Sequence, residues 1–188
     1  SAIGRGQWDE LQCGTLPALK GGLFAGVKFG KDGQNTALAV AVKTKDGRIL
    51  VECIDCRPTR AGTGWILDFL ERARPEAVAV DGAAGQQLLA DAMKSRKLKA
   101  PVLPTVKQII TANAAFEQAV NGKNLCHMGQ PSLAQAAANC DKRAIGTSGG
   151  FGYRSIKDGV AIELLDSAIL AFWQCAEKKE RKKQQIRY

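Results

Sequence analysis

The sequence has no feature of a membrane-spanning or secreted protein. A membrane helix needs about 18 consecutive apolar residues, and no stretch of the sequence approaches this length. The N-terminus also lacks the charged segment followed by an apolar segment that is typical of a signal peptide. The nucleotide-binding pattern GxxxxGK followed by Ser or Thr is also missing. We therefore expect an intracellular protein that makes no contact with membranes and lacks a nucleotide-hydrolysing motor of that type.

Cysteine is present, but without a pattern that favours disulfides. The six cysteines lie mostly inside apolar runs, where a free thiol behaves as a small hydrophobic residue, so we expect them to be reduced. Cys53 and Cys56 form a CxxC motif on a predicted strand. Positions three apart on a strand point to opposite faces and cannot share an ion, so we expect no zinc site.

Length and charge favour one compact, basic domain. The chain has 188 residues, enough to bury a core without disulfides or a structural metal. Lys and Arg outnumber Asp and Glu by 27 to 18, and the formal net charge of +9 attracts polyanions such as nucleic acid. We divide the chain into a linker or N-terminal arm at 1–20, a domain at 21–177 and a basic tail at 178–188, which in most proteins would be a solvated helix end.

The first half of the domain has the pattern of an antiparallel sheet. Apolar runs at Leu23–Phe29, Thr36–Lys43 and Arg48–Asp55 are separated by the turn signals GKDG and KDG. We therefore expect three strands that form a meander. After Pro58 the apolar residues recur at helical spacing, and this helix ends before Pro75.

The second half alternates helices with short strands. Ala77–Val80 is a wholly apolar run, typical of a strand covered on both faces. A fifth short strand is expected at Val102–Leu103, between two prolines. Further helices are expected at 86–95, 106–120, 131–139 and 160–176, and a glycine-rich loop at 146–152. The predicted fold is an α/β mixed sheet, a three-stranded antiparallel meander followed by a fourth and a fifth strand, with helices on its faces.

Asp81 is the first candidate functional residue. It lies where the buried fourth strand ends and Gly82 opens the turn to the next helix. Ligands gather at such strand ends, so Asp81 is a candidate for catalysis or metal binding. The alternative is that Asp81 only caps the turn or the helix at 86–95.

Asp166 is the second candidate, in the apolar segment IELLDSAILAF of the last helix. An unpaired carboxylate is costly in such surroundings, and a divalent metal shared with Asp81 would supply the missing cation. Glu163, one turn earlier, lies on roughly the same helix face. The alternative is that Asp166 lies at the boundary between core and solvent, or pairs with a lysine.

A meander, a carboxylate that ends the fourth strand and another on the last long helix form the layout of RNase H-like nucleases, which this sequence resembles. The stretch VNGKNLCHMGQPSLAQAAAN at 120–139 and the closing VAIELLDSAILAFW resemble the C-terminal half of large terminase subunits from tailed phages and prophages. GVKFGKDG, TGWILDFL and AVAVDGAAG are most similar to terminases from phages of actinobacteria. The resemblance covers residues 22–176 and implies an RNase H-like fold with helices on both faces of the sheet.

The resemblance also implies a metal centre. In the family, three acids hold one or two Mg²⁺ or Mn²⁺ ions, which activate a water for attack on a phosphodiester. Asp81 matches the acid of the fourth strand, and Asp166 matches the acid of the final helix. The family's first-strand Asp has no match, because this sequence reads GVK there, ending at Lys28. Asp32, just past that strand, is the nearest carboxylate, and is either the third catalytic and metal-binding acid or an ordinary turn residue.

Several residues are candidates for contact with DNA. Strand alternation places Lys28 on the face opposite Val27 and Phe29, where its ammonium would take the place of one ion or hold a phosphate. His127, the only histidine, is either close to DNA, as the resemblance favours, or structural. The glycine-rich loop either approaches the phosphate backbone and orders on binding, or is a flexible surface loop. Its flanking basic residues are Lys142, Arg143 and Arg154.

The function implied by the resemblance is that of a divalent-metal-dependent endodeoxyribonuclease, the nuclease domain of a DNA-packaging terminase that cuts concatemeric double-stranded DNA in the cytoplasm of a bacterial host. Its expected partners are that DNA, a terminase ATPase domain that would precede residue 1, the portal and the small terminase subunit. Two alternatives stay open. One is an RNase H-like DNA-binding module with weakened catalysis, which Lys28 favours, and the other is a resolvase or transposase type of RNase H-like nuclease.

Overall fold

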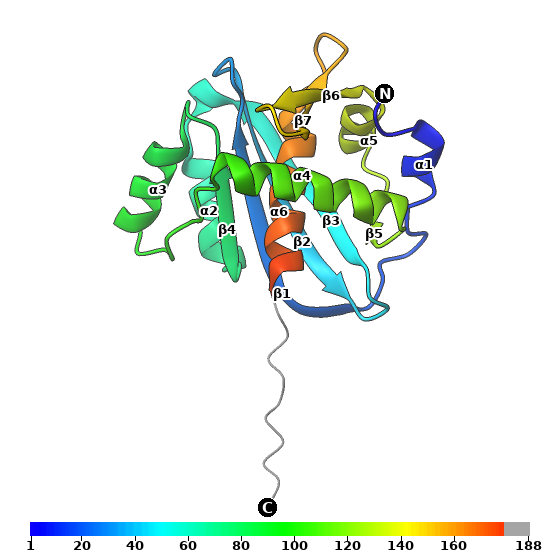
Figure 1. The fold of residues 1–188 in the computed structure, drawn as a ribbon. Coiled ribbons are helices and arrows are strands. Elements are labelled where there is room, and N and C mark those ends of the chain that lie inside the picture. The colour runs from blue at the N-terminus through cyan, green and yellow to red at the C-terminus, as the bar shows by residue number, and fades with distance from the viewer. Residues whose placement is uncertain (179–188) are drawn as a thin grey trace, which may run out of the picture.

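A five-stranded sheet forms the centre of the protein in a computed structural model, which describes residues 1–178 (Figure 1). Strands β1 (Leu19–Phe29), β2 (Asn35–Thr44) and β3 (Ile49–Pro58) form the expected antiparallel meander. β4 (Ala77–Asp81) pairs in parallel with β1, and β5 (Leu125–Cys126) pairs in parallel with β3. The strand order β4-β1-β2-β3-β5 places the ends of β1 and β4 side by side.

Helices cover both faces of this sheet, as predicted. α6 (Glu163–Glu177) lies on β1, β2 and β3, and α4 (Val106–Asn121) and α5 (Pro131–Ala138) pack beside it. In Figure 1, α4 crosses in front of α6. On the opposite face, α2 (Gly64–Ala73) and α3 (Gln86–Ser95) cover β1 and β4. Each of these two helices buries positions that recur every three or four residues, which is the period from which it was predicted.

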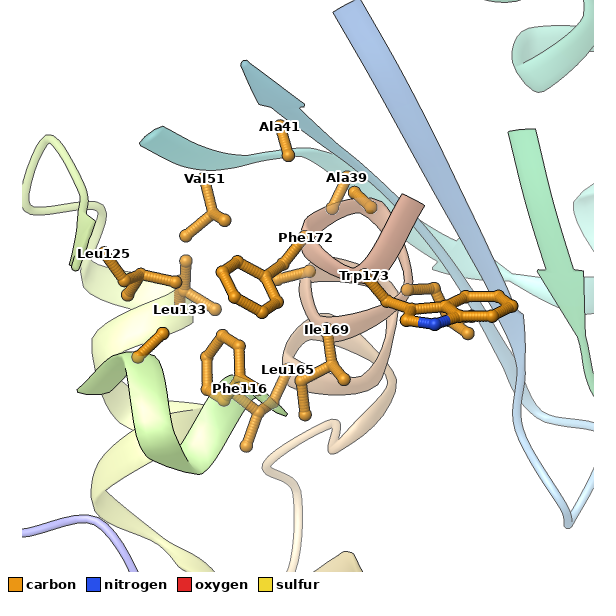
Figure 2. Close-up of a cluster of buried hydrophobic side chains, with 14 of the residues drawn as sticks. Ala39, Ala41, Val51, Phe116, Leu125, Leu133, Leu165, Ile169, Phe172 and Trp173 are labelled. Atoms are coloured by element: carbon orange, nitrogen blue, oxygen red, sulfur yellow. The ribbon is translucent and has the colours of Figure 1, made fainter. Parts of the chain in front are cut away.

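The larger hydrophobic cluster lies between the sheet and α4, α5 and α6. Figure 2 shows Phe116 of α4 beside Phe172 of α6, with their ring centroids 5.6 Å apart, and Val51 and Leu133 close to them. All four side chains are buried, and burial of each stabilises the fold by about 1.5–3 kcal/mol relative to exposure. The cluster thereby fixes α6, and the carboxylates at its first turn, on the sheet.

Alternation along β1 decides which side chains face α6. Val27 and Phe29 pack in the cluster on the α2 and α3 side. Gly26 faces α6 and allows its backbone to approach, because a Cβ there would lie 2.2 Å from the Ser167 carbonyl oxygen. Lys28 is the next residue on the α6 side, as the alternation predicted.

Two elements differ from the sequence-based prediction. Residues 102–103 form only a single parallel bridge, to Ala79, and the flanking prolines lack the amide hydrogens that would extend it. The expected loop at 146–152 is instead part of a hairpin formed by β6 (Cys140–Ile145) and β7 (Gly150–Ser155). Its glycines concealed the strand, because they interrupt the alternation of apolar and polar side chains.

Residues 1–20, which we expected to form a linker or arm, pack onto the domain. The short helix α1 (Arg5–Asp9) buries Trp8, whose side chain is 1% exposed. Its ring stacks on His127 with 4.4 Å between the centroids. Gln12 then pairs in parallel with His127, and β1 already begins at Leu19. Little in residues 1–20 indicated this docking, because so short a helix shows no sustained period.

A β-bulge in β3 changes the expected orientation of the CxxC motif. Cys53 pairs with Ala39 and Cys56 pairs with Ala37, which leaves Ile54 as the extra residue. Ala37 and Ala39 are two apart on β2 and share a face, so the two cysteines share a face as well. The prediction that they point to opposite faces is therefore wrong. All six cysteines are free thiols.

Within residues 1–178, no helix is both long and apolar enough to cross a membrane. The basic tail predicted at 178–188 lies outside the described residues except for Lys178, which forms an ion pair with Glu76.

Candidate active site

A lysine and an aspartate meet at the ends of β1 and β4. The parallel register pairs Lys28 with Asp81, and Lys28 Nζ donates a hydrogen bond to Asp81 Oδ2 at 2.5 Å. Their side chains are only 13% and 20% exposed. Because either charge alone would be costly to bury, each group holds the other in place.

α6 supplies two more carboxylates. The helix begins at Glu163 rather than at the predicted Val160, so Asp166 lies in its first turn and not in its middle. The unpaired N–H groups of a first turn favour negative charge. Glu163 is 7% exposed, and neither acid has an ion pair or side-chain partner among residues 1–178. Glu163 was not among the metal-binding acids expected from the sequence, although its spacing of one turn from Asp166 was a signal.

Asp32 lies beside Glu163, around Gly30. A Cβ at Gly30 would be 2.2 Å from Glu163 Oε1 and 3.1 Å from Asp32 Oδ1, so both carboxylates gather over the same backbone position. Asp32 Oδ1 also accepts a hydrogen bond of 2.9 Å from the backbone N–H of Gln34, as in an ordinary turn. Asp32 is therefore both a turn residue and a neighbour of the α6 carboxylates.

The β6–β7 hairpin brings Arg143 to these acids. Arg143 pairs across the hairpin with Gly152, where a Cβ would lie 3.3 Å from Arg143 Nη2, so the glycine leaves room for the guanidinium. Arg143 lines the same pockets as Asp166. From the sequence, Arg143 was only a residue beside a loop, and the hairpin is what turns it toward the carboxylates.

Three pockets adjoin the cluster. A neighbouring pocket of about 360 Å³ is lined by Lys28, Lys31, Asp81 and Arg143 and by neither α6 carboxylate. The polar side chains of the small pocket, which has a volume of about 20 Å³, include Lys28, Asp81, Arg143 and Asp166. The large pocket, of about 230 Å³, lacks Asp81 and includes Lys28, Asp32, Arg143, Glu163 and Asp166. Asp81 and Asp166 therefore border a common pocket, the small one, whereas Asp32 borders the large pocket and not the small one.

Burial makes the α6 carboxylates hard to ionise. It raises the pKa of Asp166 to about 6, although the charges of Lys28 and Arg143 oppose this rise. Burial also raises the pKa of Glu163. The negative charges of neighbouring carboxylates add to both shifts. On the α6 side of the site, the negative charge of the carboxylates therefore exceeds the positive charge of the neighbouring basic side chains.

The carboxylates of the large pocket fit a hard divalent cation, whereas Asp81 in its present arrangement does not. Carboxylate oxygens are the ligands that Mg²⁺ and Mn²⁺ prefer, and among residues 1–178 Glu163 and Asp166 have no ion-pair or side-chain partner. Asp81 already binds the Lys28 ammonium. In the described part of the chain, no three acidic, thiol or imidazole side chains are close enough to hold an ion as they stand, so binding needs rotations of these side chains.

His127 does not line these pockets. Its side chain is 2% exposed and contacts the Trp8 carbonyl oxygen through Nε2 at 2.8 Å. Nδ1 accepts a hydrogen bond of 3.0 Å from the backbone N–H of Gly129. Burial lowers the pKa of His127, which favours the neutral ring that these contacts require. Contrary to the predicted DNA contact, the ring has no free nitrogen for DNA and serves to join the N-terminal segment to the domain.

The other two basic residues of the hairpin have protein partners. Lys142 forms an ion pair with Glu117, and its Nζ lies over the Phe151 ring, 4.3 Å from the centroid. Arg154 pairs with Asp141 at 3.3 Å and also borders the large pocket. Of these two, Arg154 is the one that the structure brings to the site.

No family model and no curated protein matches this sequence. Among solved structures, the chain is similar to the large terminase of bacteriophage HK97, with a TM-score of 0.65 and 15% identity, covering 92% of this chain and 43% of that one. It is also similar to the large terminase nuclease of the thermophilic phage G20c with bound magnesium, with a TM-score of 0.59 and 16% identity, covering 93% of this chain and 98% of that one. The large terminase nuclease domain of Thermus phage P74-26 has a TM-score of 0.61 and 16% identity, with 95% of this chain and 98% of that one covered. The chain thus spans less than half of the HK97 protein but nearly all of the two nuclease domains, and it has their RNase H-like fold.

Proposed function

We propose that this chain, which has the fold of phage large terminase nuclease domains, is a divalent-metal-dependent endonuclease domain that hydrolyses double-stranded DNA. The observation that carries the proposal is the meeting of Asp81 and Asp166, far apart in sequence, at one pocket with Lys28 and Arg143. Carboxylates without partners favour a bound cation, and basic side chains beside them favour an anion such as phosphate. The similar G20c nuclease was solved with bound magnesium, which supports Mg²⁺ or Mn²⁺ as the cofactor.

The side chains have separable roles in this proposal. When bound, a divalent ion would polarise a phosphate oxygen and lower the pKa of a water. Glu163 and Asp166 would hold that ion. Asp81 would keep the Lys28 ammonium in place beside the scissile phosphate, and Arg143 would bind phosphate oxygens through paired N–H donors.

The place of this domain in a larger machine is a further part of the proposal. We infer that concatemeric phage DNA in the bacterial cytoplasm is the substrate, and that an ATPase domain, the portal and the small terminase subunit are the partners. The net charge of +9 supports binding to DNA. The packing of residues 1–20 supports a nuclease domain that includes this segment. An origin close to the phages of actinobacteria is also a proposal, based on the sequence motifs.

One alternative is favoured by a specific contact. The Lys28–Asp81 ion pair occupies a carboxylate that would otherwise be available to a metal, which favours an RNase H-like DNA-binding module with weakened catalysis. Titration of Mn²⁺ in a plasmid-nicking assay separates the two functions. DNA binding without nicking at any Mn²⁺ concentration would favour the binding module and reject the nuclease.

The test of the nuclease site is a pair of substitutions. Asp81→Ala and Asp166→Ala are each expected to abolish Mn²⁺-dependent nicking while the circular dichroism spectrum stays that of the folded protein. The control is Asp68→Ala, because Asp68 lies on α2 with a side chain 60% exposed, and this variant should nick like the wild type. Full activity in both site variants would reject the proposed site.

A further inference from the structure

The Lys28 ammonium already stands at the place of a cation beside Asp81. Its Nζ lies 2.5 Å from Asp81 Oδ2, and the parallel register of β1 and β4 fixes the two residues opposite each other. Lys28 also lines the small pocket together with Asp166. The positive charge of Lys28 therefore contacts the carboxylate of Asp81 and borders the same pocket as that of Asp166.

The charge around Asp81, rather than the space, disfavours a metal ion there. The small pocket has about 20 Å³, room for roughly one water, but Asp81 also lines the neighbouring pocket of about 360 Å³ together with Lys28, Lys31 and Arg143. Among the described residues that line this neighbouring pocket, Asp81 is the one acid against three basic side chains. A divalent cation beside Asp81 would therefore face positive charge, whereas the large pocket offers the carboxylates of Asp32, Glu163 and Asp166.

Glu163 indicates independently that the large pocket takes a cation. This side chain is 7% exposed, and its carboxylate contacts no donor in the described part of the chain except its own backbone N–H. Its Oε1 lies over Gly30 together with Oδ1 of Asp32, at the wall of the large pocket. A buried acid directed into a pocket and left without a basic partner is stabilised by a cation bound there.

We infer that the site takes a single divalent cation, held in the large pocket by Asp166, Glu163 and Asp32, and that the Lys28 ammonium replaces a second cation at Asp81. The inference deepens the proposed nuclease function and rests on it for the role of the ion. Lys28 and Asp81 then form a fixed, metal-independent half of the site. The α6 carboxylates and Asp32 form the half that depends on metal.

The first experiment measures binding of Mn²⁺ to the metal-free full chain by isothermal titration, with electron paramagnetic resonance to count the bound ions. We expect one Mn²⁺ per chain. Glu163→Gln is expected to weaken binding by more than about tenfold, whereas Asp81→Asn should change it by less than about threefold. Two ions on the wild type, no binding at all, or equal losses in the two variants would overturn the inference.

The second experiment removes the ammonium. Lys28→Asp frees Asp81 and adds a carboxylate beside it, so the number of bound Mn²⁺ ions should rise from one to two. Lys28→Met keeps a long side chain without the charge or a ligand, and should stay at one ion. A Lys28→Asp protein that is folded and still binds one ion contradicts the inference; if this variant does not fold, the wild-type and Asp81→Asn titrations still decide.

Metal binding and DNA nicking, measured together, distinguish a failure of the single-cation site from a failure of the nuclease. One bound ion without any nicking of DNA would leave the single-cation site standing and reject the nuclease. Two bound ions together with nicking of DNA would support the nuclease and reject the single-cation site.

Discussion

At the residue scale, the four acids of the site differ in how their charge is compensated. Asp81 has the Lys28 ammonium at 2.5 Å, whereas Asp166 and Glu163 have no such partner within residues 1–178 and lie in a partly buried first turn. Asp32 is more exposed and retains the hydrogen bond of a turn residue. The negative charge is thus neutralised on the β4 side of the site and left uncompensated on the α6 side. A cation would stabilise the site most on the α6 side.

Asp166→Asn is expected to stabilise the metal-free protein at neutral pH. Burial raises the pKa of Asp166 from 3.8 to about 6 in the folded protein. The folded protein therefore binds more protons than the unfolded chain between these values, and the free energy of unfolding falls as pH rises through this window. Above this pH window the ionised Asp166 carboxylate lowers the free energy of unfolding by at most roughly 3 kcal/mol. Urea unfolding in EDTA from about pH 4 to about pH 8 measures the difference between the two proteins.

The control for this prediction is Asp158→Asn, a change at an exposed acid before α6. Its stability should follow the wild-type pH dependence throughout. If Asp166→Asn also followed the wild type, the Asp166 carboxylate would not be a source of the pH dependence.

At the scale of elements, backbone approaches hold the site together. α6 lies directly on β1 at Gly26, where a Cβ would be 2.2 Å from the Ser167 carbonyl oxygen and 2.6 Å from the Ala171 nitrogen. This close approach at Gly26 sets the distance between α6 and β1, and it thereby brings the carboxylates of α6 to face Lys28. The hairpin then adds Arg143 from another direction.

Gly26→Ala is expected to destabilise the protein by about 3 kcal/mol, because the added methyl group overlaps backbone atoms of α6 that cannot rotate away. Thermal unfolding measures the loss. Gly64→Ala, at the start of α2, is the matched control, since a Cβ there meets nothing within 4 Å. A Gly26→Ala protein that melts with the wild type would show that α6 does not rest on β1.

Trp8→Ala is expected to destabilise the protein by about 3–5 kcal/mol, because it leaves a cavity in the core and removes the ring that stacks on His127. Leu16→Ala, in the same N-terminal segment but 62% exposed, should have little effect. The measurement is chemical denaturation followed by circular dichroism. Equal stability of the Trp8→Ala variant and the wild type would mean that residues 1–20 behave as a detachable linker.

At the scale of the whole molecule, basic side chains surround the acidic cluster. Arg143 lines the small and large pockets and also a neighbouring pocket that includes Lys31 and Gly82. Arg154 borders the large pocket. With a net charge of +9 over the chain, this arrangement favours a polyanion that passes over the site, with the carboxylates beneath it.

Arg143→Ala is expected to weaken binding to double-stranded DNA and to reduce the slope of log affinity against log salt concentration by about 1, the value for one phosphate contact. Fluorescence anisotropy in EDTA measures binding without cleavage. Arg96→Ala is the control, because Arg96 is already paired with Asp68 and Glu71 of α2, and its slope should match that of the wild type. A slope unchanged in Arg143→Ala would place the DNA elsewhere.

The sequence was sufficient for the features that depend on local periodicity. Apolar runs separated by turn signals defined the meander, and the helical period located α2, α3, α4 and α5 to within a few residues. Strand alternation placed Lys28 on the α6 side of β1, and the position of Asp81 at a strand end indicated the edge of the sheet where the site lies. These properties follow from backbone geometry that neighbouring residues share.

Only the tertiary structure decided how those parts combine. The Lys28–Asp81 ion pair, Glu163 over Gly30 and Arg143 beside Asp166 join residues from different elements, as does the stacking of Trp8 on His127. The bulge that turns Cys53 and Cys56 to one face depends on pairing with β2. Periodicity describes one segment at a time, whereas register, bulges and helix height are set by packing between segments, and that is why the acids could be named from the sequence but their partners could not.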